Sequence, residues 1–72
     1  MKESTFQIVV WNEGQYYVAQ CLNIDISSFG ESKEEAIKNL DEALHLHFVD
    51  AGHEEIHEVA NPEIITISVK HA

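Results

Sequence analysis

The chain has 72 residues, a formal net charge of -9 and one Cys. A chain of this size buries only about 60% of the surface that its unfolded form exposes, which leaves little material for a deep catalytic cleft. With 44% apolar residues, three Gly and one Pro, the chain is too hydrophobic for a disordered acidic tail, so we expect a single folded domain over residues 1–72. Thirteen acidic residues against four basic ones disfavour binding to nucleic acid or a membrane and favour a basic protein partner.

Cysteine usage and the N-terminus predict a cytoplasmic protein. Cys21 cannot form an intrachain disulfide, whereas a secreted domain this small normally needs several. The longest apolar run near the N-terminus, Ile8-Val9-Val10-Trp11, is too short for a signal peptide or a membrane span.

The first thirty residues predict three strands. Residues 5–11 combine β-branched and aromatic side chains, and the turn sequence Asn12-Glu13-Gly14 follows them. Residues 16–21 then provide the returning strand of a hairpin. A third, shorter strand is predicted at residues 26–29, ending at Gly30, because apolar and polar residues alternate before it.

A helix is predicted to begin after Ser32, which forms a capping box with Glu35. In this box the Ser oxygen accepts from the third helical N–H, and the Glu is expected to reach back to the N–H of Ser32. One face is apolar over about four to five turns, and Gly52 is the expected stop. The predicted core positions of this face are Ile37, Leu40, Leu44 and Phe48, with Ala36, Ala43 and Ala51 beside them.

The last third predicts a connection and one more strand. Residues 53–63 are polar, with at most one helical turn, and Pro62 is expected to hold Asn61 in extended geometry. Residues 64–69 alternate as a strand, with Ile65, Ile67 and Val69 on one face.

The expected fold is therefore α+β, a β-β-β-α-β two-layer sandwich with one helix on a three-stranded antiparallel meander plus a fourth strand. A right-handed crossover favours a place for the fourth strand beside the first. The uncovered sheet face would show Trp11, Tyr17 or their neighbours to water, so we expect self-association, as a dimer or tetramer, or a protein partner.

One segment matches a metalloprotease motif. His53-Glu54-Glu55-Ile56-His57 has the spacing His-Glu-x-x-His, in which two His bind zinc and the Glu acts as base. A chain rich in His and Glu produces this pattern by chance, and the segment lies in a predicted connection with little chain left for a third ligand. We interpret it as a solvent-exposed loop and expect no metal site.

Other candidate chemistry has a simpler interpretation too. His45 and His47 are two residues apart on the helix, so they point in different directions and cannot bind one metal together. The carboxylates lie mostly on the helix and the connection, which indicates a solvated face rather than a two-metal nuclease. Cys21 has no clear His partner and is expected in the core. We therefore expect no catalytic residues and no cofactor.

The order of these features resembles the HicB-like antitoxin family over nearly the whole chain. In that family a Gly-Tyr-Val-Ala strand is followed by a short Gly-acidic-Ser/Thr cap and a helix with the pattern Glu-Glu-Ala-x-x-Asn-Leu-x-Glu-Ala. The strongest part here is residues 30–44. The residues that carry the likeness are Ile8-Val9-Val10-Trp11, Gly14, Tyr17-Val18-Ala19-Gln20-Cys21, Phe29-Gly30-Glu31-Ser32, Glu34-Glu35-Ala36-Ile37-Lys38-Asn39-Leu40 and Glu42-Ala43-Leu44.

The resemblance implies a truncated ribonuclease H-like fold and a role as the antitoxin of a type II toxin-antitoxin pair. Its partner would be a small basic HicA-like toxin that cleaves messenger RNA and that the antitoxin binds and occludes. Family members are not known as nucleases. The chain departs from the family at Cys21-Leu22-Asn23-Ile24-Asp25, where a Pro-rich bend is usual, and it continues into no DNA-binding tail, so we expect no direct contact with nucleic acid.

Three hypotheses follow from the sequence. The first is a non-enzymatic antitoxin that binds a HicA-like toxin, with Tyr16, Asp25, Phe29 and Glu31 as candidate partner-binding residues. The second is an orphan domain that associates with itself or regulates another process. The third, least supported, is a metal-dependent hydrolase that uses His53, Glu54 and His57.

Overall fold

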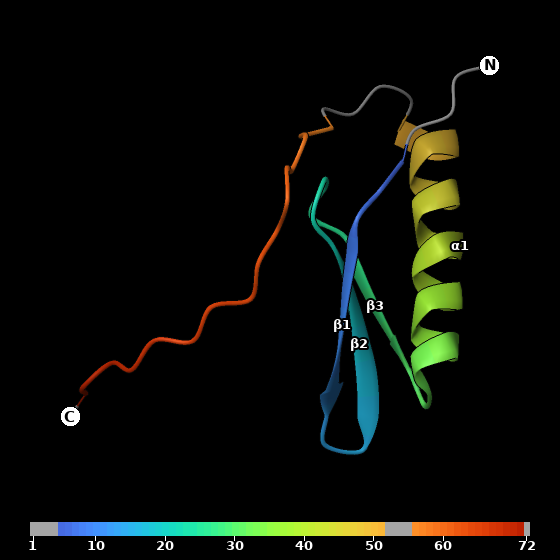
Figure 1. Cartoon of the computed structure of the whole chain (residues 1–72). Helices are drawn as coiled ribbons and strands as arrows, with labels where there is room; N and C mark the ends of the chain where they lie inside the picture. The colour runs from blue at the N-terminus through green and yellow to red at the C-terminus, as the bar shows by residue number, and fades with distance from the viewer. Residues whose placement is uncertain (1–4, 52–55, 72) are drawn as a thin grey trace.

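Three antiparallel strands and one helix form the folded part of the computed structural model, which describes residues 5–51 and 56–71 (Figure 1). The strands are β1 (Ile8–Glu13), β2 (Tyr16–Cys21) and β3 (Ser27–Gly30), and the helix is α1 (Lys33–Ala51). The sheet has the order β1-β2-β3, and α1 lies along one of its faces. The predicted α+β class, the three-stranded meander and the single helix are confirmed.

The β1–β2 hairpin turns at Gly14 and Gln15, with Glu13 paired to Tyr16. Gly14 has a φ of 73°, and a glycine at the first central position of a two-residue hairpin loop is the pattern of a type II′ turn. The turn was predicted at residues 12–14. β1 begins three residues later than predicted. It ends two residues later, at Glu13, because pairing with β2 continues into its polar residues.

The start of α1 has the predicted capping box with one difference. The Ser32 hydroxyl accepts a hydrogen bond from the N–H of Glu35 at 3.1 Å. The Glu35 carboxylate accepts from the N–H of Glu31 at 2.6 Å, not from that of Ser32 as predicted. The carboxylate thus ties the loop after β3 to the first turn of the helix, where negative charge is favourable.

The core is thin and lies between β2 and α1. Its buried members are Ala19, Cys21, Ile24, Ala36, Leu40 and Leu44. Phe48 is partly buried and stacks on Phe6, with ring centroids 5.7 Å apart. The prediction for Ile37 is wrong, because the side chain is exposed: it lies one residue, or about 100°, around the helix from Ala36, beyond the stripe that faces the sheet. The helix ends at Ala51, and the predicted stop, Gly52, lies outside the described residues.

Alternation along the strands separates the two faces of the sheet. Ala19 and Cys21 of β2 are buried beneath α1, and Tyr17, two residues before Ala19, packs against the same core cluster. The expectation that Tyr17 lies on the uncovered face is therefore wrong. Trp11 pairs with Val18 and lies on the uncovered face, as predicted.

The predicted strand at residues 64–69 does not form within the chain. Residues 56–71 contain neither helix nor strand, and the segment leaves the domain as an arm (Figure 1). Asn61 has a φ of 51°, so the extended geometry expected before Pro62 is wrong; asparagine tolerates this left-handed region better than most residues. Alternation of side chains favours a strand, but a strand also needs a neighbour for its backbone N–H and C=O groups.

Gly30 generates the first testable prediction, because it lies where β3 meets α1. A Cβ atom at this position would lie 2.7 Å from the backbone N of Ala36 and 2.9 Å from the backbone C of Glu35. We expect Gly30→Ala to lower the free energy of unfolding by about 1–3 kcal/mol, the range for overpacking. Ser27→Ala, at an exposed position of the same strand, is the matched control and should change it by less than about 0.5 kcal/mol. Equal urea midpoints for the two variants would contradict the close approach.

Candidate functional site

The face of the sheet that turns away from α1 is the candidate site. Since Ala19 and Cys21 point toward the helix, Val18 and Gln20 point to the opposite side, and so do the residues paired with them. We call this surface the outer face. Its members are Val9, Trp11 and Glu13 from β1, Tyr16, Val18 and Gln20 from β2, and Ser27 and Phe29 from β3.

Three aromatic side chains dominate the outer face. Trp11, Tyr16 and Phe29 are all exposed, Phe29 to 66%. The rings of Tyr16 and Phe29 meet edge to face, with centroids 5.6 Å apart. The indole N–H of Trp11 donates to a carboxylate oxygen of Glu13 at 2.6 Å. The outer face is therefore an aromatic surface that carries a carboxylate at one end.

The structure brings together two of the four predicted partner-binding residues. Tyr16 and Phe29 are in contact, and Glu31 follows Phe29 by two residues at the same end of the sheet. Asp25 lies beyond Cys21, at the other end of β2. At about 3.3 Å per residue, Cys21 itself is roughly 17 Å from Tyr16 along the strand. The four residues thus do not form one cluster. Asp25 and Glu31 mark opposite ends of the sheet.

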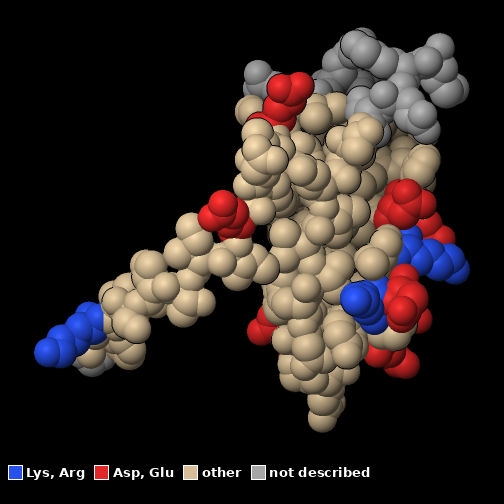
Figure 2. Space-filling view, viewed as in Figure 1, with Lys and Arg blue, Asp and Glu red and all other residues tan. Residues whose placement is uncertain are grey.

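Charge is distributed unevenly over the domain. In the view of Figure 2 most of the red acidic side chains lie over α1, beside blue lysine side chains, and the remainder of the domain is mostly tan. The first turn of α1 carries Glu34 and Glu35, and no basic residue lies in its last turn. The helix side is therefore solvated and acidic, whereas the outer face is mainly apolar.

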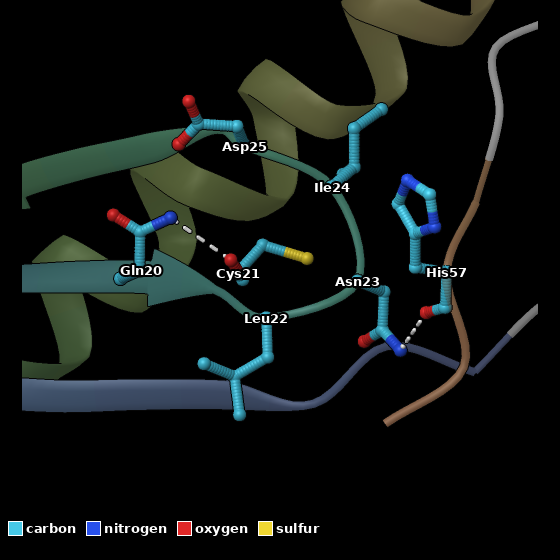
Figure 3. Close-up of a pocket in the computed structure, with 7 residues that line it drawn as sticks. All are labelled: Gln20, Cys21, Leu22, Asn23, Ile24, Asp25 and His57. Atoms are coloured by element: carbon cyan, nitrogen blue, oxygen red, sulfur yellow. Dashed lines mark hydrogen bonds between the residues drawn. The ribbon is translucent and has the colours of Figure 1, made fainter.

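A second candidate is an open hollow of about 310 Å³ at the end of β2 (Figure 3). It is lined by Gln20, Cys21, Leu22, Asn23, Ile24, Asp25 and His57. The side chain of Cys21 is buried in the core, as predicted, and the Asp25 carboxylate points away from the His57 ring. Cys21 thus contributes to the core, and Asp25 and His57 do not face each other.

Asn23 holds this hollow together and was not identified from the sequence. It is only 5% exposed, and its side-chain amide donates to the backbone carbonyl of His57 at 2.7 Å. Its side-chain oxygen accepts from the N–H of Gln7 at 2.8 Å, and its backbone carbonyl accepts from the N–H of His57 at 2.9 Å. Asn23 thus joins the segment before β1 to the beginning of the arm. We call this set of three hydrogen bonds the Asn23 clamp.

The His-Glu-x-x-His motif lies mostly outside the described residues, which include only its last two positions. The backbone of His57 is committed to the Asn23 clamp on both its N–H and its carbonyl. Over residues 5–51 and 56–71, no three His, Cys, Asp or Glu side chains are grouped closely enough to hold a metal ion.

The two helix histidines diverge, as predicted from their spacing. His45 is exposed, and its Nδ1 atom lies 2.8 Å from the backbone carbonyl of Asp41. His47 is partly buried, and its ring meets Phe48 edge to face at 5.3 Å. They share no site.

Asn39 is a second residue whose role sequence reasoning missed. Its side-chain amide donates to the backbone carbonyl of Phe29 at 2.8 Å and so ties α1 to β3. The sequence signal for this role is the position of Asn39 next to Leu40, at the border of the apolar stripe, because a partly buried amide there needs a hydrogen-bond partner. This bond occupies a backbone carbonyl on the edge of β3 that points away from β2.

Comparison with known proteins places the chain in a family. The model of a protein family described as "Family of unknown function (DUF7387)" matches residues 2–69. No curated protein and no solved structure matches the chain. Within the part of the chain that the structure describes, the helix is not long and apolar enough to cross a membrane.

The Asn23 clamp makes a testable prediction. Asn23→Ala removes the acceptor of the Gln7 N–H and the donor to the His57 carbonyl, so we expect the protection of the Gln7 and His57 amides against hydrogen exchange to fall. The loss should be about 1–3 kcal/mol at Gln7, whose N–H donates directly to the lost side chain. Asp25→Ala, an exposed position in the same loop, is the control and should leave both amides protected. Unchanged exchange in Asn23→Ala would show that the clamp does not hold the two segments.

Proposed function

This chain belongs to the family of unknown function DUF7387, and we infer its function from the surface that the structure presents. We propose that it is a protein-binding module that neutralises a small basic HicA-like toxin by binding it and covering its RNA-cleaving surface. In this proposal the chain is a HicB-like antitoxin, with a fold related to a truncated ribonuclease H, and it acts by occlusion without chemistry of its own.

The outer face is the observation that carries the proposal. Its three exposed aromatic side chains lie on a rigid, paired sheet, while the single described helix covers the opposite face. Aromatic residues are enriched at the centres of protein interfaces because they bury a large apolar area at a small cost in side-chain entropy. A surface of this kind supports binding to another protein far better than binding to a small polar ligand.

The charge of the chain indicates which kind of partner the outer face would select. The formal net charge is -9, and Glu13, Glu31 and Asp25 stand on or beside the ends of the sheet. A chain this acidic attracts a basic partner and speeds its encounter, whereas the apolar outer face supplies most of the affinity. An RNA-cleaving toxin needs a basic surface for its substrate, so an acidic protein with an apolar platform competes directly with RNA.

The two other hypotheses gain less support. An orphan domain that associates through its outer face would use the same aromatic residues, so binding measurements must separate it from an antitoxin. For a hydrolase, no described cluster of metal ligands supports the motif at His53, Glu54 and His57, and the first two of these residues lie outside the described part of the chain.

The proposal predicts binding that depends on the outer face and on salt. With a basic toxin encoded beside this chain, Trp11→Ala and Phe29→Ala should each weaken binding at least about tenfold, as at interface hot spots. Leu46→Ala is the matched control, because Leu46 is equally apolar and exposed but lies on α1. Surface plasmon resonance at several salt concentrations should show an association rate that falls as salt increases.

Two outcomes would contradict this function. One is the absence of toxin binding at low ionic strength. The other is toxin binding that Leu46→Ala weakens as much as Phe29→Ala does. Self-association lost in Trp11→Ala and Phe29→Ala, without any toxin binding, would instead establish the orphan hypothesis.

A further inference from the structure

Residues 62–71 are the extended part of the arm, and no described residue covers their apolar side chains. Ile64, Ile65, Ile67 and Val69 are 68–86% exposed. The arm leaves the domain and raises the radius of gyration to 14.3 Å, whereas a compact chain of this length has roughly 11 Å. Folded monomers rarely expose a contiguous apolar segment of this kind, which marks an interaction site.

The arm has the sequence of a β-strand. Residues 64–69 are all β-branched except Ser68, and they contain no Gly or Pro. Ile65, Ile67 and Val69 alternate with Ile64, Thr66 and Ser68, so one side of the extended segment is fully apolar and the other is mixed. The six residues match the length of β1, which also has six.

The free edge of β1 is the place in the fold that lacks a strand. The N–H of Leu22 donates to the carbonyl of Gln7, so the backbone groups of Gln7 and of every second residue after it point toward β2. The N–H and C=O groups of Ile8, Val10 and Asn12 therefore point toward the free edge. Unpaired groups of this kind form a template for another strand.

The opposite edge of the sheet, formed by β3, has fewer free backbone groups for an added strand. β3 has only four residues, and the carbonyl of Phe29 on its outer edge already accepts from Asn39. The chain then turns directly into α1 through the Ser32 cap. β1 is thus the longer edge and the one that no described side chain occupies.

The anchoring of the arm indicates that its partner edge belongs to another molecule. The Asn23 clamp fixes His57 near Gln7, just before β1, and the backbone bends at Asn61, before Pro62. From this point the arm runs away from its own sheet instead of along it (Figure 1). A connecting segment that directs a strand outward is a low-cost route to exchange between copies.

Charge also favours a second copy. The extended part of the arm, residues 62–71, carries Glu63 and Lys70 and so has no net formal charge, whereas the chain as a whole has thirteen Asp and Glu against four Lys and Arg. The arm can therefore approach the acidic domain of another copy without the repulsion that two whole domains would experience.

We propose that two copies of this chain exchange their arms, so that residues 64–69 of each copy pair with the free edge of β1 in the other and complete a four-stranded sheet. Ile65, Ile67 and Val69 would extend the side that α1 covers, next to Ile8 and Val10, which pack against the core there. Each copy donates one strand and accepts one, so the assembly closes with two-fold symmetry and does not grow into a fibre. This proposal is independent of the toxin.

The first test measures the oligomeric state of the full chain by analytical ultracentrifugation over a range of micromolar concentrations. The wild type should be a dimer, and the double variant Ile65→Asp/Ile67→Asp should be a monomer, with a dissociation constant raised at least about 100-fold. Thr66→Asp/Ser68→Asp is the matched control: it places the same charge on the mixed side of the same arm and should remain a dimer. Circular dichroism should show that both variants keep their helix, because the core lies between Ala19 and Leu44.

The second test identifies the edge to which the arm binds. In a sample mixed from isotope-labelled and unlabelled wild-type chains, filtered NMR spectra should show contacts between the methyl groups of Ile65 or Ile67 in one chain and those of Ile8 or Val10 in the other. A monomeric wild type, or such contacts within one chain only, would overturn the exchange, and so would a dimer that survives Ile65→Asp/Ile67→Asp.

Discussion

A single helix can cover one face of a sheet, and this constraint determines most of what the structure shows. α1 buries Ala36, Leu40 and Leu44 against β2, and the core that these contacts form has six buried apolar residues in the described part of the chain. The helix must approach closely to exclude water from so small a core, which explains why Gly30 has no room for a side chain. The aromatic outer face and the edge of β1, which the helix does not cover, stay open to solvent.

The outer face and the arm differ in what each can offer a partner. The outer face is a rigid surface, because β1, β2 and β3 hold its side chains in fixed register. The arm contributes backbone hydrogen-bonding groups and a row of isoleucines, which is the chemistry of strand addition. The two surfaces meet at β1, where the outer face carries Trp11 and the edge carries Val10. The proposed dimer and the proposed toxin complex would thus use different groups of this strand.

Sequence reasoning was reliable for the elements whose determining contacts lie within a few residues of each other, although the geometry of Asn61 before Pro62 was not predicted correctly. The hairpin, the Ser32 cap and the whole of α1 depend on contacts across a few residues, and all three were predicted, with shifts of a few residues at β1 and its turn. The fourth strand was predicted from alternation alone, but alternation does not reveal which edge a strand will pair with. Likewise Ile37 has the spacing of a core residue, but the stripe of α1 that contacts the sheet is too narrow to cover its side chain.

The candidate site shows the same limit. Tyr16 and Phe29 were named separately, and only the pairing of β2 with β3 places their rings side by side. Asp25 was placed with them because it was expected in an acidic loop, but it lies beyond the opposite end of β2. Asn23 was missed because its partners lie 16 and 34 residues away in the chain, and a polar residue in a loop carries no local sign of such contacts.

The order of segments along the chain has a consequence for assembly. In the described part of the chain the buried apolar core lies between Ala19 and Leu44, so the domain forms its core without the arm. Contacts between segments that are close in the chain form faster than contacts between molecules, so each folded copy presents its free β1 edge before residues 64–69 have a partner. Every copy is then an acceptor and a donor at the same time. The concentration of free copies therefore sets how fast the proposed exchange completes.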